Sequence, residues 1–187
     1  YSIKTSYNIS QFIMNNYLTS TIFRKVLASL SGLFLVIFLI GHLAGNLQLF
    51  IPDVHGQTQF NKYALFMTTN PIVKILSIIT YSAILLHIFI TLYLVIQSKK
   101  ARPIGYAVSS GNDNSNWSSR NMALLGTIIL FFLIVHLKSF WYKMHFGEMP
   151  YQYLSDGTKI KDLHLITTSA FKNPLYTFFY VFSMGAL

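Results

Sequence analysis

The stretch VLASLSGLFLVIFLIGHLAGNLQLF, residues 26–50, decides the fold of this chain. It exceeds the roughly 20 residues that a helix needs to cross a bilayer. Its apolar residues form a continuous run, with neither the single stripe of a surface helix nor the alternation of a half-buried strand. The one ionisable side chain in the run is His42. The stretch therefore predicts a transmembrane helix that carries an imidazole.

Three further apolar runs follow, over 71–96, 122–142 and 174–187. Pro71 and Pro174 each come directly after an asparagine, which is typical of the first turn of a helix. The sequence thus predicts an all-α integral membrane helix bundle with four transmembrane segments visible. The fourth segment stops inside its apolar run, so we expect it to be truncated. We expect one transmembrane domain over 1–187.

Composition narrows the class of protein. Only 10% of the 187 residues are charged, whereas soluble domains carry about 25%. The chain has no cysteine, which excludes iron–sulfur clusters and Cys-linked haem within it. The net charge is +9, but the cations cluster at the ends of the apolar runs, as juxtamembrane lysines and arginines do. We therefore expect membrane lipid and no nucleic acid as a partner.

The distribution of basic residues predicts the orientation. Arg24 and Lys25 precede the first run, and Lys99, Lys100 and Arg102 follow the second. Because cytoplasmic loops carry an excess of lysine and arginine, we expect a cytoplasmic N-terminus. We also expect residues 1–21 to form an interfacial segment on the membrane surface.

Histidines fall within three consecutive apolar runs, at His42, His87 and His136. A single buried histidine is most simply a polar contact between helices. Three of them favour a function, because ionisable groups at membrane depth are costly. At about 1.5 Å per residue, His42 and His136 lie roughly 24 and 21 Å from the cytoplasmic edge. His87 lies roughly 14 Å from that edge.

Two imidazoles at one level on facing helices can hold a planar iron porphyrin, and two of them leave no open position on the iron. We therefore expect His42 and His136 to be axial ligands of a distal b haem. His87 is the expected ligand of a second, proximal haem. Its partner is expected on the fourth helix, and depth arithmetic puts it just beyond Leu187 in a longer native chain.

Other uses of the histidines fit the sequence less well. A zinc site favours close spacings such as HxxxH, and none occurs. A proton relay needs carboxylates at depth, and the first three runs hold no Asp or Glu. Four polar residues near the cytoplasmic end are candidates for contacts with haem propionates: Arg24, Ser29, Ser31 and Arg120. For the two arginines, contact with lipid headgroups is an equal alternative.

Ordered sequence blocks resemble a known family. SLSGLFLVIFLIGHLAGN, FNKYALFMTTNP, LLHIFITLYLVIQSKKARPIGY and SRNMALLGTIILFFLIVHL together look like the single-subunit, dihaem cytochrome b anchor of bacterial succinate:quinone oxidoreductases (succinate dehydrogenase or fumarate reductase). The resemblance covers about residues 20–187. It implies five transmembrane helices, two b haems, and one histidine ligand from each of the first four helices.

The resemblance also implies partners and a location. A flavoprotein subunit would oxidise succinate, and an iron–sulfur subunit would relay electrons to this chain. The chain would pass them through its haems to a quinone, expected to be menaquinone, and would have no activity alone. It would be a multi-pass protein of the bacterial cytoplasmic membrane, and the whole complex is a candidate for oligomerisation. Ser29 aligns with a serine that contacts a haem propionate in a relative.

The candidates for quinone contact lie in the first outer connection. Some relatives place a glutamate in or near the first outer connection, and residues 51–70 here contain none. Asn61 and Tyr63 are the candidates for quinone contact. For Asp53 and His55 we favour a solvated loop.

Two alternative functions stay open on the sequence. One is a b-type cytochrome anchor of another respiratory complex, a hydrogenase or a formate dehydrogenase. The other is a cofactor-free membrane transporter or scaffold, in which the histidines would only make polar contacts between helices.

Overall fold

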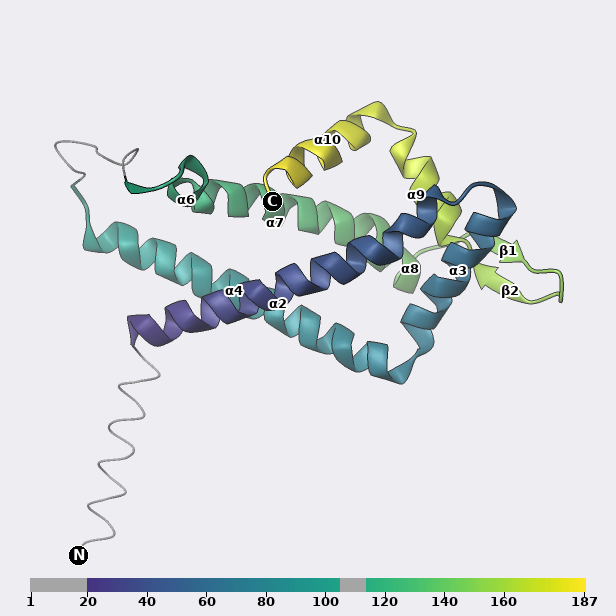
Figure 1. The fold of residues 1–187 in the computed structure, drawn as a ribbon, viewed down its shortest axis with the longest axis horizontal. Coiled ribbons are helices and arrows are strands. Elements are labelled where there is room, and N and C mark those ends of the chain that lie inside the picture. Colours follow the sequence, from purple (N-terminus) through teal and green to yellow (C-terminus); the bar gives the residue numbers. More distant parts are fainter. Residues whose placement is uncertain (1–19, 105–113) are drawn as a thin grey trace, which may run out of the picture. The chain divides into compact units, whose positions relative to one another are not determined.

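The computed structural model describes residues 20–104 and 114–187, which are almost entirely helical (Figure 1). The interfacial segment predicted over 1–21 lies outside the described residues except for its last two. The helices and strands run in this order: α2 (Thr21–Asn46), 3-10 helix η1 (Leu47–Phe50), α3 (Asp53–Thr69), α4 (Pro71–Ala101), α6 (Trp117–Arg120), α7 (Met122–His136), π-helix η2 (Leu137–Tyr142), α8 (Lys143–Phe146), β1 (Tyr151–Tyr153), β2 (Lys159–Lys161), α9 (Leu163–Phe171) and α10 (Pro174–Gly185).

Three helical stretches are long and apolar enough to cross a membrane, namely Thr21–Phe50, Pro71–Ala101 and Met122–Phe146. They contain the first three runs predicted from the sequence, so the helical membrane fold is confirmed. α10 begins at Pro174, as predicted, but it ends at Gly185 and is shorter than the roughly 20 residues of a full span. The fourth span therefore stays a prediction.

Asparagine caps explain where α4 and α10 begin. The side-chain oxygen of Asn70 accepts hydrogen bonds from the backbone N–H groups of Ile72 and Val73, at 2.9 and 3.3 Å. Asn173 does the same for the second and third residues of α10, at 3.0 and 3.2 Å. Each cap satisfies amide groups that have no partner inside the helix, and the proline that follows needs none. The two Asn–Pro starts are confirmed.

The first connection contains the helix α3, so Asp53 and His55, which were expected in a solvated loop, lie in the first turn of a helix. The buried face of α3 carries Gly56, Phe60, Asn61 and Ala64. Gly56, Phe60 and Ala64 are four residues apart, and Asn61 is adjacent to Phe60, so the four positions share one face of a helix. Position 56 requires glycine because the backbone of Ile51 approaches it closely. A side chain at this position would overlap the carbonyl oxygen of Ile51.

The segment 158–170 is divided between a strand and a helix. β1 and β2 pair antiparallel with Tyr151 opposite Lys161. Gly157, at φ 82°, supplies the left-handed conformation that the turn between them needs. Asp162 then caps α9, since its carboxylate accepts from the backbone N–H of Leu165. The strand forms because the aromatic residues and the Asp-Gly turn favour a hairpin over a helix here.

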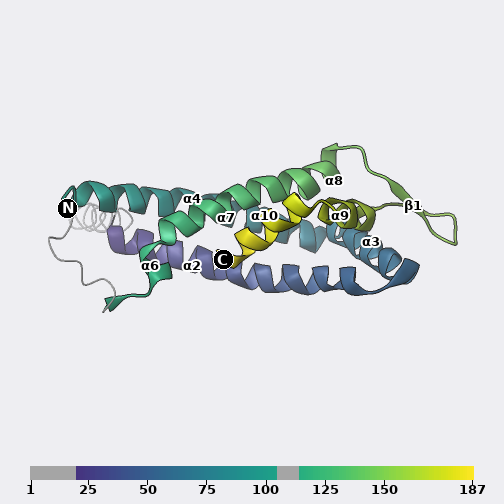
Figure 2. The same ribbon diagram turned by 90° about the horizontal axis from the view of Figure 1, so that it is seen from above.

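The described residues fall into two compact units. Unit 1 comprises 20–42 and 75–104, which are most of α2 and α4. Unit 2 comprises 43–74 and 114–187. In unit 2, α10 runs beside α7 (Figure 2). The small core of unit 2 is formed by Ala64, Met144 and Met149, with Leu163 and Ile166 packed against them.

Candidate functional site

His87 lies on α4 and faces α2 within unit 1. Its Nδ1 is 3.1 Å from the carbonyl oxygen of Ala28 and 3.1 Å from Oγ of Ser31. A carbonyl oxygen can only accept a hydrogen bond, so Nδ1 must carry the proton. The tautomer is thereby assigned from the partner: Nδ1 is the donor and Nε2 keeps its lone pair.

The hydroxyl of Ser31 supports the same assignment. It donates to the backbone carbonyl oxygens of α2, at 2.8 Å for Leu27 and 3.1 Å for Ala28. With its hydrogen used there, the oxygen meets His87 with a lone pair. Within the described residues, Nε2 of His87 forms no hydrogen bond. An imidazole held by Nδ1–H to a backbone carbonyl, with Nε2 available, is the arrangement of metal-bound histidines.

Gly32 permits this close approach of the helices. A Cβ atom at Gly32 would lie 3.1 Å from Cε1 of His87, tighter than ordinary contact. By contrast, Cβ atoms at Gly41 and Gly126 would meet no described atom within 4 Å. Among Gly32, Gly41 and Gly126, only Gly32 therefore lies against a candidate ligand.

Arg24 lies in the first turn of α2 and contacts α4. Its Nη1 donates to the hydroxyl of Tyr93 at 2.9 Å, and its guanidinium carbon is 4.5 Å from the centre of that ring. A groove of about 300 Å³ opens beside this pair, lined by Phe23, Arg24, Leu27, Phe89, Ile90 and Tyr93. Arginine has five N–H donors, so donors remain for an anionic group at this groove.

The other propionate candidates are placed differently. Ser29 is exposed, whereas Ser31 is buried and already bonded to α2 and His87. Arg120, the last residue of α6, donates to the backbone carbonyl of Ser115, which precedes this helix. The structure thus gives Ser31 a task that the sequence did not indicate, the orientation of His87. Contacts of all four residues with propionates stay a prediction.

His42 and His136 share a local arrangement. Each stacks on the phenylalanine four residues earlier: His42 on Phe38, with ring centres 5.5 Å apart, and His136 on Phe132, at 5.6 Å. Residues four apart lie on one helix face, so each aromatic ring restricts the imidazole. The FxxxH spacing is the signal of this arrangement in the sequence. The two histidines belong to different units, and their pairing stays a prediction.

The surroundings of His136 in unit 2 are aromatic. The centre of its ring is 5.4 Å from that of Phe140 and 6.3 Å from that of Tyr180. His136 is also the last residue of α7, directly before the π-helix η2. π-helical turns are rare and occur often at functional sites. The flat apolar rings around a half-buried imidazole fit a macrocycle such as a porphyrin.

Asn61 belongs to a buried polar network in unit 2. It is 1% exposed. Its Nδ2 donates to Oε1 of Gln152 at 2.9 Å and to Oδ1 of Asp162 at 2.8 Å. Its Oδ1 accepts from the backbone N–H of His164 at 2.9 Å. Both donor hydrogens of the amide are therefore used within the chain, which favours a structural role over quinone contact.

Asp162 is the centre of this network. Besides Asn61, its carboxylate accepts from Nε2 of Gln57 at 2.6 Å and from the backbone N–H of Leu165 at 2.9 Å. Gln152 in turn donates to the hydroxyl of Thr58 at 2.8 Å. The network joins α3, the hairpin and the start of α9. None of these three elements belongs to a candidate membrane span.

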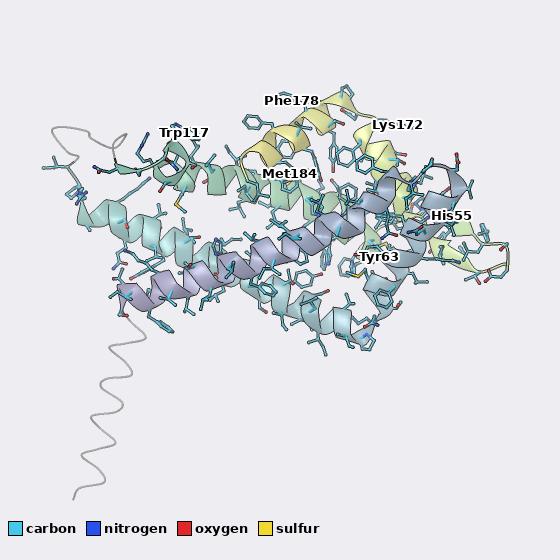
Figure 3. All side chains as sticks on the ribbon, in the orientation of Figure 1. His55, Tyr63, Trp117, Lys172, Phe178 and Met184 are labelled. Atoms are coloured by element: carbon cyan, nitrogen blue, oxygen red, sulfur yellow. The ribbon has the colours of Figure 1, made fainter. Side chains whose placement is uncertain are left out.

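Tyr63, the second quinone candidate, lies on α3 (Figure 3). Its hydroxyl oxygen contacts Gly45, where a Cβ atom would overlap it. Gly45 follows His42 by three residues in α2. Asp53 and His55 are exposed at the start of α3, as expected for solvated residues. Contact of Tyr63 with a quinone stays a prediction.

Comparison with protein-family models, with curated proteins and with solved structures finds no match. The fold defines the class as a helical membrane protein with three helices able to span a bilayer. The resemblance to succinate:quinone oxidoreductase anchors therefore remains a hypothesis that depends on the sequence blocks.

Proposed function

We propose that this chain is the membrane anchor and electron-transfer subunit of a succinate:quinone oxidoreductase. It passes electrons from an iron–sulfur subunit through b haems to menaquinone in a bacterial cytoplasmic membrane. The observation that carries the proposal is the state of His87. A carbonyl and a serine hold its Nδ1–H, and its Nε2 lone pair is left without a hydrogen bond from the described residues.

The residues fit a haem in three respects. His87 has the tautomer of a metal ligand, fixed by Ala28. His136 lies among aromatic rings that suit an apolar macrocycle. Arg24 has spare donors beside a groove in unit 1, where an anionic propionate would be neutralised. In this proposal His42 and His136 hold one haem, and His87 holds the other.

The haem, when bound, supplies one-electron transfer. The protein supplies orientation and insulation. The hydrogen bond from His87 to Ala28 keeps the imidazole from rotating and raises the electron density on Nε2. The apolar helices exclude water from the iron, and low polarity around an iron centre tunes its reduction potential. Succinate chemistry itself would belong to the flavoprotein subunit.

Basic residues support a partner at one end of α4. Lys99 and Lys100 are exposed in its last turn, and Arg102 follows directly. These cations complement the negative end of the helix dipole. In the proposal they also form the cytoplasmic surface on which the iron–sulfur subunit docks.

Haem stoichiometry tests the proposal. The protein is purified from membranes, and haem b per chain is measured by the pyridine haemochromogen spectrum. We expect His87→Ala to lose one haem, and His136→Ala to lose the other. His55→Ala is the matched control, because His55 is an exposed histidine outside the spans, and we expect it to retain full haem content.

The same preparation separates the alternatives. Absence of haem from the wild-type protein would contradict the proposal and favour a transporter or scaffold. Haem binding together with a hydrogenase or formate dehydrogenase subunit in the purified complex would retain the ligand assignment and replace the partner. Co-purification of a flavoprotein and an iron–sulfur subunit, with succinate-dependent haem reduction, is the expected result.

A further inference from the structure

A π-helical turn near the end of the third span changes which side chains share a face. η2 covers Leu137–Tyr142 and lies between α7 and α8. In an α-helix, residues three and four apart are neighbours, and residues five apart point in different directions. A π-helix closes its hydrogen bonds from i to i+5, so it brings residues five apart much closer to one face. Lys138 and Lys143 are five apart across this turn.

Both lysines line a groove in unit 2. Its volume is about 580 Å³. The polar lining comes from Lys138, Ser139 and Lys143, and the apolar lining comes from α7 and α9. The seven residues that line the groove are Ile134, Val135, Lys138, Ser139, Lys143, Ile166 and Ala170.

The groove lies at the depth of a membrane–water boundary. Counted from Met122 at about 1.5 Å per residue, Lys138 is roughly 24 Å and Lys143 roughly 32 Å along the span. The hydrocarbon core of a bilayer is about 30 Å thick. Lys138 thus reaches the headgroup layer from just inside the core, as long basic side chains do. Ile134 and Val135 lie one turn deeper, at the level of acyl chains.

Among the described residues, the two ammonium groups have no anionic partner. Neither Lys138 nor Lys143 forms an ion pair within 20–104 and 114–187. Two positive charges and a hydroxyl above an apolar wall match the two halves of an anionic phospholipid. The headgroup phosphate would bind the two lysine ammonium groups, and an acyl chain would lie along the apolar wall.

We propose that this groove is a binding site for one anionic phospholipid, with its phosphate between Lys138 and Lys143 and an acyl chain along Ile134 and Val135. The hydroxyl of Ser139 supplies a further hydrogen-bond donor. This site involves none of the candidate haem ligands, and it would exist whatever electron-transfer partner the chain has. The π-helical turn is the structural feature that creates it.

Native mass spectrometry tests the site. The purified protein is equilibrated in detergent with equal amounts of phosphatidylglycerol and phosphatidylcholine that carry identical acyl chains. Each lysine near an anionic lipid surface adds favourable binding free energy. For two lysines the sum corresponds to about a 30-fold preference for the anionic lipid. We expect this preference in the wild-type protein and its loss in Lys138→Gln/Lys143→Gln.

Two control variants complete the test. Lys62→Gln/Lys172→Gln removes the same net charge at exposed positions outside the groove, and we expect it to keep the preference. Lys138→Arg/Lys143→Arg retains both charges and should also keep it. Equal binding of the two lipids by the wild-type protein would overturn the proposal. So would displacement of the lipid by excess inorganic phosphate alone, which would indicate a phosphate site.

Discussion

Two polar clusters in the described part of the chain use hydrogen bonds in opposite ways. Around Asp162 in unit 2, the carboxylate and both amide hydrogens of Asn61 bond to other groups of the chain. At His87 in unit 1, the chain satisfies Nδ1 and leaves Nε2 with its lone pair. A saturated cluster stabilises the fold, whereas a cluster with one oriented and unused ligand atom is prepared for a metal.

The largest expected effect breaks the saturated cluster. Asp162→Ala leaves the donors of Asn61, Gln57 and the Leu165 backbone without their acceptor. Each buried donor left unpaired costs about 1 kcal/mol or more, so we expect a loss of about 3 kcal/mol. This lowers the midpoint of thermal unfolding, followed by circular dichroism, by roughly 10 °C.

The control for that variant is Asp156→Ala, since Asp156 is an exposed aspartate at the hairpin turn. It should leave the unfolding midpoint almost unchanged. If Asp162→Ala unfolds at the wild-type temperature, or if it removes haem while the fold persists, the division between a structural and a ligand cluster is wrong.

A second prediction concerns the ligand cluster. A methyl group at Gly32 would lie 3.1 Å from Cε1 of His87, so Gly32→Ala forces the imidazole to shift by a few tenths of an ångström. We expect an altered low-spin haem signal in electron paramagnetic resonance for one haem, with little change in stability. Gly185→Ala is the control, because a Cβ there meets nothing within 4 Å. An unchanged haem signal in Gly32→Ala would contradict ligation by His87.

Ser31→Ala should have a smaller effect at the same place. It removes one of the two groups that hold Nδ1 of His87, while the carbonyl of Ala28 remains. Loss of such a supporting group weakens metal binding by about 10-fold. We expect haem to transfer to excess apomyoglobin about 10-fold faster from this variant. Ser98→Ala, at the exposed end of α4, should match the wild-type rate.

The smallest effect is expected at the hairpin turn, which is polar but exposed. The backbone N–H of Thr158 donates to Asp156 and lowers the pKa of that carboxyl below its usual 3.8. Because the pKa of Asp156 is depressed in the folded state, the contribution of its carboxylate to stability is present above pH 3.8. This contribution is lost as the pH falls through the pKa of the folded state. The protection of the Thr158 amide against exchange, relative to its intrinsic rate at each pH, should therefore fall in acid, and Asp156→Asn should abolish this pH dependence.

The sequence predicts the spans well because their signal is strong and local. Long apolar runs and the Asn–Pro starts at Pro71 and Pro174 determine the helices without reference to packing. α3 and the hairpin were not predicted, because their stability comes from contacts with segments distant in the sequence. The spacing of Gly56, Phe60 and Ala64 was the available signal for α3.

The candidate site divides in the same way. The three histidines are recognisable from their depth alone. The tautomer of His87 was not predictable, because it depends on the carbonyl of Ala28, 59 positions away. The role of Asn61 depends likewise on Asp162, 101 positions away. Nor does an apolar run reveal the π-helical turn that brings Lys138 and Lys143 together.

Replacement of His87 by methionine tests the central claim most directly. A thioether in place of one imidazole keeps an iron ligand but raises the reduction potential of the haem. The account predicts that a redox titration of His87→Met, followed by visible absorption, shows one haem at a clearly higher midpoint potential and the other unchanged. A titration identical to that of the wild-type protein would show that His87 is not a ligand of the iron.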